Sequence, residues 1–175
     1  MFPLLFSLAH AGTLAGVTLP DTATVAGQTL ALNGMGLREK YTIDVYVGGL
    51  YLPTPTRDGA AAVALDAPKR VVMHFTYRKV TRAQMLETFL EGFGDQATGP
   101  QKPNVDKLLA VVPEAMYAGD EISFDYAPGV GTTMSIKGKA VATVPGAEFM
   151  RMVFGVWLGA RPPSAALKAG MLGTG

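Results

Sequence analysis

The order of the expected elements along the chain predicts an α+β fold. Strand-like segments come first, two helices follow, a hairpin comes next, and further helices end the chain. Hairpin connections favour an antiparallel sheet, and amphipathic helices need an apolar surface to cover. We therefore expect one large antiparallel sheet with a layer of helices over one face.

Segments with strand character occupy the first part of the chain. Residues 24–32 alternate loosely, residues 41–52 are rich in β-branched and aromatic types, and residues 70–77 alternate again. The sequence Asn33-Gly34-Met35-Gly36 has turn chemistry and is expected to separate the first two strands. Residues 60–65 are expected to form a short helix.

Residues 41–52 (YTIDVYVGGLYL) are expected to form a strand. The Gly48-Gly49 pair inside it predicts a bulge or a close approach by another element. Strict alternation puts two sets of side chains on opposite faces. One set is Tyr41, Ile43, Val45 and Val47, and the other is Thr42, Asp44 and Tyr46.

Helical patterns fill the middle and the end of the chain. Thr81 followed by Gln84 is a capping box that begins a helix, whose apolar face holds Met85, Leu86, Phe89, Leu90 and Phe93. A second helix is expected over residues 104–117. A hairpin should join residues 121–126 to residues 132–137 through Pro128-Gly129. The last expected helices cover residues 147–158 and 164–171.

The composition excludes several classes of site. The chain has no cysteine, which removes thiol nucleophiles and thiolate metal ligands, and a net charge of +1 disfavours nucleic-acid binding. His10 and His74 are too few for a histidine-rich metal site, and His74 is expected to be structural. We predict no metal and no cofactor, and the residues alone identify no catalytic group.

Residues 1–11 (MFPLLFSLAHA) are apolar and end in Ala-His-Ala before Gly12, as at a signal-peptide cleavage site. The segment is short, and no Lys or Arg precedes Arg38. The pattern predicts a signal peptide over residues 1–11 and a periplasmic or secreted protein, with an apolar first strand as the alternative. No stretch approaches the length of a membrane span.

Residues 32–52 (LNGMGLREKYTIDVYVGGLYL) resemble the signature of the chalcone isomerase-like family, a Gly-x-Gly-x-Arg element before a Val-Tyr-Val-x-x-Leu-Tyr strand. Gly119-Asp120-Glu121-Ile122 continues the resemblance. So do residues 154–159 (FGVWLG) and Pro162-Pro163. It spans residues 17–173 as one domain and points to a bacterial branch, closer to the non-catalytic fatty-acid binders than to the plant enzymes.

The resemblance implies an open-faced β-sandwich, in which a cleft separates a large antiparallel sheet from its helices. It also implies two ligand-binding residues. Arg38 matches the arginine that steers the substrate in the enzymes and pairs with the carboxylate in the fatty-acid binders. Tyr46 matches a position that is Thr in the enzymes and Tyr in the binders. A guanidinium beside a phenol suits a carboxylate.

Two features stand against a simple transfer of these roles. The Tyr, the Asn and the late hydroxyl of the enzymes have no identifiable counterparts in this chain. In one extended strand, Arg38 and Tyr46 would stand about 26 Å apart. They can share a ligand only if the chain folds back between them, and Tyr41-Thr42-Ile43 carries no turn signal.

The sequence therefore predicts a protein that binds a small apolar or amphiphilic molecule, such as a fatty acid, with Arg38 at its polar head. Two alternatives remain open. One is an isomerase, an intramolecular lyase that cyclises a chalcone-like phenolic enone, in which Arg38 stabilises developing enolate charge. The other is an envelope scaffold without a ligand. The oligomeric state is left open.

Overall fold

The computed structural model describes residues 12–175, so the predicted signal peptide over residues 1–11 lies outside the described residues. A seven-stranded sheet forms the centre of the molecule, and each strand is antiparallel to its neighbours. The strands lie in this order: β11 (Lys139–Val144), β10 (Gly131–Ile136), β9 (Glu121–Ala127), β6 (Lys69–Phe75), β5 (Ile43–Leu52), β4 (Gln28–Lys40) and β3 (Thr22–Val25).

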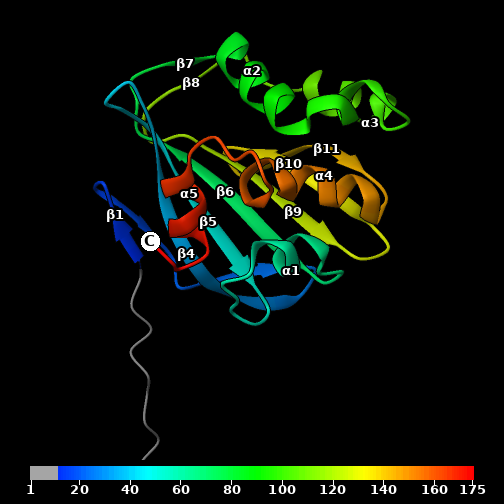
Figure 1. Ribbon diagram of the computed structural model, residues 1–175, viewed down its shortest axis with the longest axis horizontal. Coiled ribbons are helices and arrows are strands. Elements are labelled where there is room, and N and C mark those ends of the chain that lie inside the picture. Colours follow the sequence, from blue (N-terminus) through cyan, green and yellow to red (C-terminus); the bar gives the residue numbers. More distant parts are fainter. Residues whose placement is uncertain (1–11) are drawn as a thin grey trace, which may run out of the picture.

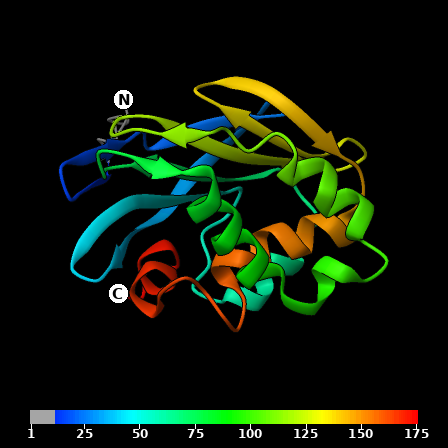
Figure 2. The same ribbon diagram turned by 90° about the horizontal axis from the view of Figure 1, so that it is seen from above.

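Helices cover one face of this sheet (Figures 1 and 2). They are α1 (Gly59–Ala64), α2 (Arg82–Phe93), the 3-10 turn η1 (Gly94–Thr98), α3 (Lys102–Leu109), α4 (Ala147–Leu158) and α5 (Ala165–Met171). The hairpin of β1 (Gly12–Leu14) and β2 (Val17–Leu19) packs on the opposite face. A small two-stranded ladder joins β7 (Val80–Thr81) to β8 (Ala115–Met116). The predicted α+β architecture is confirmed.

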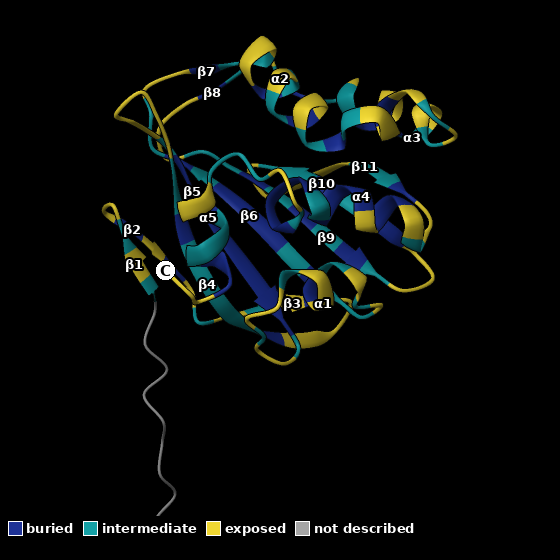
Figure 3. Cartoon of the chain, viewed as in Figure 1, coloured by how far each residue is buried: buried dark blue, intermediate teal, exposed yellow. Residues whose placement is uncertain are grey.

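Helix α4 lies at the centre of the helix layer because it is apolar nearly all round. Its bounds are those that the sequence predicts, and eight of its side chains are buried (Figure 3): Phe149, Met150, Met152, Val153, Phe154, Val156, Trp157 and Leu158. In the described part of the chain, no helix is long and apolar enough to cross a membrane.

The capping box that begins α2 is also confirmed. The Thr81 hydroxyl accepts a hydrogen bond from the Gln84 backbone N–H, and the Gln84 side-chain oxygen accepts one from the Thr81 N–H. Three residues of its predicted apolar face, Met85, Phe89 and Phe93, are buried, whereas Leu90 is exposed.

Three turn predictions are wrong. Residues 24–32 are not one strand, because Ala26-Gly27 forms a turn with positive φ between β3 and β4. Asn33-Gly34-Met35-Gly36 does not interrupt the chain but lies inside β4. Its glycines allow α5 to pack closely against β4, since a Cβ at Gly34 or Gly36 would collide with backbone carbonyl groups of that helix. The third concerns the start of the strand expected over residues 41–52: Tyr41-Thr42 forms a turn, and β5 begins only at Ile43.

Two other boundaries differ from expectation. The helix predicted over residues 104–117 ends at Leu109, and a turn at Ala110-Val111 leads to Pro113, since a proline disfavours helical backbone in the residue before it. Strand β11 was not predicted; it pairs with β10 through a tight turn at Lys137-Gly138. The Gly48-Gly49 pair carries no bulge, but the predicted close approach is confirmed, because side chains of α5 pack directly over Gly48.

Candidate functional site

A cavity of about 300 Å³ lies between the end of the β4–β5 hairpin and helix α2. Strand β6 and the loop that follows it complete the wall. The lining residues are Arg38, Lys40, Tyr41, Ile43, Val45, Tyr46, Met73, Phe75, Tyr77, Val80, Gln84, Met85 and Thr88. Both predicted site residues, Arg38 and Tyr46, belong to this set.

A tight turn brings Arg38 and Tyr46 together. Tyr41 and Thr42 both adopt left-handed backbone conformations, with φ of 50° and 66°, and reverse the chain between β4 and β5. Arg38 then pairs directly with Tyr46 across the two strands. The separation of Arg38 and Tyr46 expected for one extended strand therefore does not occur, because the chain folds back at two residues that are not typical of turns.

A bulge at Val45 determines which side chains enter the cavity. The register passes from the pair Arg38–Tyr46 to the pair Glu39–Asp44, so Val45 has no opposite residue. The predicted alternation of residues 41–47 is therefore wrong, because the extra residue moves Ile43 to the same side as Tyr46, and both line the cavity. The Val45 carbonyl accepts the backbone N–H groups of Thr76 and Tyr77, which ties the loop after β6 to the bulge.

Tyr46 lies at the inner end of the cavity and is 3% exposed. The indole Nε1 of Trp157 donates a hydrogen bond of 3.1 Å to its hydroxyl oxygen. Because an indole N–H can only donate, the proton of the Tyr46 hydroxyl remains for another acceptor. Burial raises the pKa of Tyr46 to about 12, although the Trp157 hydrogen bond and the Arg38 charge act in the opposite direction. The phenol is therefore a neutral donor at physiological pH.

Positive charge gathers at the outer end of the cavity. Arg38 and Lys40 line it, and none of its described lining residues is acidic. Arg38 donates from Nη1 to the Glu39 carbonyl at 2.9 Å, and among residues 12–175 it forms no ion pair with a carboxylate. The guanidinium thus keeps donors that an anionic ligand can use.

Helix α2 supplies the wall that faces the sheet. Met85 contributes apolar surface, while Gln84 and Thr88 contribute polar groups. The side-chain oxygen of Gln84 is engaged in the capping box, so its amide hydrogens are the part available to a ligand. The Thr88 hydroxyl donates to the Gln84 carbonyl one turn earlier.

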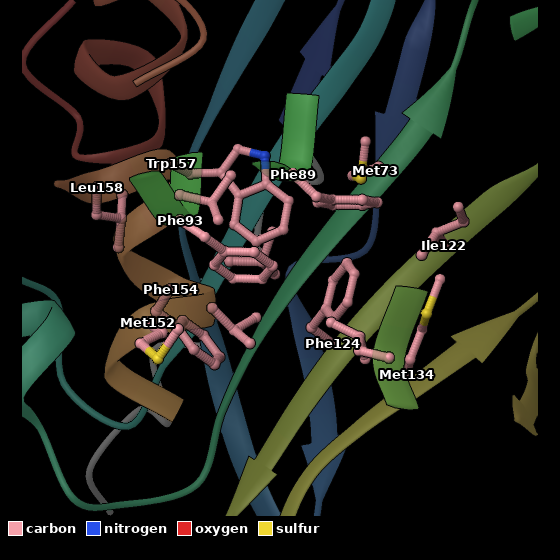
Figure 4. Close-up of a cluster of buried hydrophobic side chains, with 14 of the residues drawn as sticks. Met73, Phe89, Phe93, Ile122, Phe124, Met134, Met152, Phe154, Trp157 and Leu158 are labelled. Atoms are coloured by element: carbon pink, nitrogen blue, oxygen red, sulfur yellow. The ribbon is translucent and has the colours of Figure 1, made fainter. Parts of the chain in front are cut away.

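Beyond Tyr46 the space between sheet and helices is filled by packed aromatic rings (Figure 4). The Trp157 ring lies 5.3 Å from that of Phe124 and 6.3 Å from that of Phe89, measured between centroids. These rings close the inner end of the cavity. Its volume is at the lower limit of the range usual for small-molecule sites, so the shape favours a short ligand.

A second hollow, of about 600 Å³, lies between α2 and α4 and contains neither Arg38 nor Tyr46. Its charged lining combines two acids with two arginines and favours no sign of ligand charge: Asp95, Glu148, Arg151 and Arg161. His74 pairs with Glu121 across the sheet at 2.9 Å, as a structural histidine does. Across the described chain, no three potential metal ligands cluster together.

Sequence reasoning missed Lys40, Ile43, Tyr77, Gln84 and Thr88 as lining residues. One signal existed for Lys40, which follows Arg38 by two positions and so shares its face once residues 36–40 are recognised as strand. The bulge that redirects Ile43 has no sequence signal. Gln84 was identified only as a capping residue.

The chain is similar to known proteins in both sequence and fold. The sequence model of the family described as chalcone isomerase-like matches residues 11–173. A fatty-acid binding protein of Arabidopsis thaliana has a similar structure, with a TM-score of 0.74 and 15% sequence identity over 93% of this chain and 96% of that chain. No curated protein sequence matches. The match over nearly the whole length shows that this chain belongs to the chalcone isomerase-like family.

Proposed function

We propose that this protein binds a small amphiphilic carboxylic acid, such as a short-chain or medium-chain fatty acid, in the cavity between the β4–β5 hairpin and α2. The acyl chain lies against the apolar wall, and the carboxylate meets Arg38, which is the cross-strand neighbour of Tyr46. The fatty-acid binding activity named for the structurally similar Arabidopsis protein supports the same class of ligand.

The observation that carries the proposal is the polarity of the cavity's hydrogen-bonding groups. Trp157 occupies the oxygen of Tyr46, and the capping box occupies the oxygen of Gln84, so both side chains offer hydrogens. Arg38 and Lys40 are donors without acceptor capacity. A ligand that meets several donors and two positive charges must bring acceptors and negative charge. A carboxylate meets both conditions.

The apolar part of the lining supports a short acyl chain. Met73, Phe75, Val80 and Met85 are buried around the cavity and offer only carbon and sulfur atoms to a ligand. Methionine side chains are flexible and adapt to chains of different shape. The apolar wall and the cationic outer end together match the two parts of an amphiphile.

A cavity-filling variant tests the proposal. Thr88→Phe adds a ring from α2 into the cavity, whereas Leu90→Phe adds the same ring on the exposed side of the same helix. In calorimetric titrations with decanoate, wild type and Leu90→Phe should bind alike and Thr88→Phe should lose binding. Unchanged binding in Thr88→Phe, or none in wild type, would contradict the proposal.

We also propose that the protein is exported and that mature material begins near Gly12, on the basis of the apolar residues 1–11 and their Ala-His-Ala end. N-terminal sequencing of protein recovered from the cell-envelope fraction tests this. Cytoplasmic material that retains Met1 would refute it.

A further inference from the structure

We propose that the mouth of the cavity docks on an anionic lipid surface, from which the ligand enters. The inference rests on the proposed function and adds the partner from which the site is loaded. The surface consists of the hairpin tip, residues 38–43, and the neighbouring exposed cations Arg78 and Lys79, and we name it the mouth surface.

The hairpin tip projects from the body of the sheet (Figures 1 and 2). Strand β6 pairs with β5 only from Tyr46 onward, and β3 pairs with β4 only as far as Ala31. The tip therefore has no flanking strand on either side. A segment that extends beyond its sheet in this way can reach a surface that the rest of the molecule does not touch.

The tip carries apolar side chains in contact with solvent. Tyr41 is 86% exposed and Ile43 is 40% exposed, although both also line the cavity. Tight hairpin turns with positive φ strongly favour Asn-Gly, yet Tyr41-Thr42 occupies this one. An aromatic residue in a strained backbone conformation points to a role for its side chain. Tyrosine is a residue that membrane interfaces favour.

Positive charge surrounds this apolar tip. The Lys40 Nζ lies 5.8 Å from the centroid of the Tyr41 ring. On the adjoining loop, the Arg78 guanidinium lies 6.0 Å from the Tyr77 ring, and Lys79 is exposed beside it. The acids of the hairpin, Glu39 and Asp44, lie opposite each other in the strand register, and neither lines the cavity. One face thus combines aromatic, aliphatic and cationic groups, which fits anionic headgroups above acyl chains.

The mouth surface is continuous with the cavity, so a ligand can pass directly from one to the other. Arg38, Lys40, Tyr41 and Ile43 belong both to the cavity lining and to the mouth surface. An amphiphile that leaves the lipid layer at this point passes between these side chains without crossing bulk water. Its carboxylate remains near cations along the whole path.

Vesicle sedimentation tests the proposal. Wild type should sediment with vesicles of phosphatidylcholine mixed with phosphatidylglycerol and far less with phosphatidylcholine alone. Arg78→Gln/Lys79→Gln should weaken binding about fivefold for each lost charge. Arg57→Gln is the matched control, because Arg57 is exposed in the loop after β5, at the opposite end of that strand. Ile43→Ser should also weaken binding, whereas Val130→Ser, in the exposed β9–β10 turn, should not.

The outcomes separate this inference from the proposed function. Neither Arg78 nor Lys79 lines the cavity, so their double variant should bind decanoate in solution as wild type does. Equal sedimentation with both kinds of vesicle, or equal losses in the control variants, would overturn the docking surface while decanoate binding stands. If wild type does not bind vesicles but forms a dimer that Ile43→Ser disrupts, the mouth surface is an interface with a second copy of the chain. That result would also overturn the docking proposal.

Discussion

Tyr46 on β5 and Trp157 on α4 are joined by a hydrogen bond between two buried groups that lie 111 residues apart in the chain. This bond links the sheet to the central helix at the inner end of the cavity. It also orients the phenol, because the indole N–H donates to the Tyr46 oxygen and leaves the phenol proton for another acceptor.

Tyr46→Phe should destabilise the protein by about 1–3 kcal/mol, because the buried Trp157 N–H loses its acceptor. A urea denaturation cycle of Tyr46→Phe, Trp157→Phe and the double variant measures the coupling between the two residues. The expected coupling is of the order of 0.5–3 kcal/mol. If the two single losses simply add, the hydrogen bond does not contribute to stability in solution.

Chain-length selection should depend on Met85. Met85→Ala should cost about 2–5 kcal/mol of stability and enlarge the cavity, so that the fatty acid of highest affinity becomes longer. Met150→Ala is the matched control, because Met150 is equally buried but does not line the cavity. Calorimetric titration with a series of acids would show the shift. The same preferred length in wild type and Met85→Ala would place the acyl chain elsewhere.

Lys69 gives a prediction on pH. Its side chain is 0% exposed, its Nζ donates to the carbonyls of Ala62 and Val63 at the end of α1, and it lies 4.6 Å from the Phe154 ring centroid. Burial lowers the pKa of Lys69 to about 7, from 10.5. The unfolded chain therefore holds this proton more tightly than the folded protein does. The stability that Lys69 contributes should be lowest below pH 7 and rise toward pH 10.5.

Denaturation of wild type and Lys69→Met at two pH values tests this sign. Between pH 7 and pH 9 the difference in unfolding free energy should move in favour of wild type by about 2 kcal/mol. Other titrating groups are common to both proteins and cancel in the comparison. A difference that stays constant, or that moves in favour of Lys69→Met, would contradict the lowered pKa.

The parts of the fold that the sequence predicts well are those with local signals. The reciprocal hydrogen bonds of Thr81 and Gln84 involve residues three positions apart, and α4 has buried apolar residues from its first turn to its last. The errors lie where tertiary contacts decide. Gly34 and Gly36 resemble turn residues but are small to accommodate α5, and Tyr41-Thr42 turns without a turn residue.

The candidate site shows the same difference between local sequence signals and tertiary contacts. Arg38 and Tyr46 could be selected only through the family resemblance, because an isolated arginine and a strand tyrosine have no chemistry of their own to mark them. Their juxtaposition depends on the turn at Tyr41-Thr42 and on the bulge at Val45. Neither follows from propensity or alternation, so the sequence could nominate the two residues as candidates but could not predict that they lie side by side.

The contribution of Arg38 to carboxylate recognition is the central claim, and one titration tests it most directly. Decanoate and decanol have hydrocarbon chains with the same number of carbon atoms and differ in charge, so the pair isolates the guanidinium–carboxylate contact. Such a contact contributes roughly 1.5–3 kcal/mol, and Arg38→Ala should therefore weaken decanoate binding by roughly tenfold to a hundredfold and leave decanol nearly unchanged. Equal losses for the acid and the alcohol would mean that Arg38 only supports the fold.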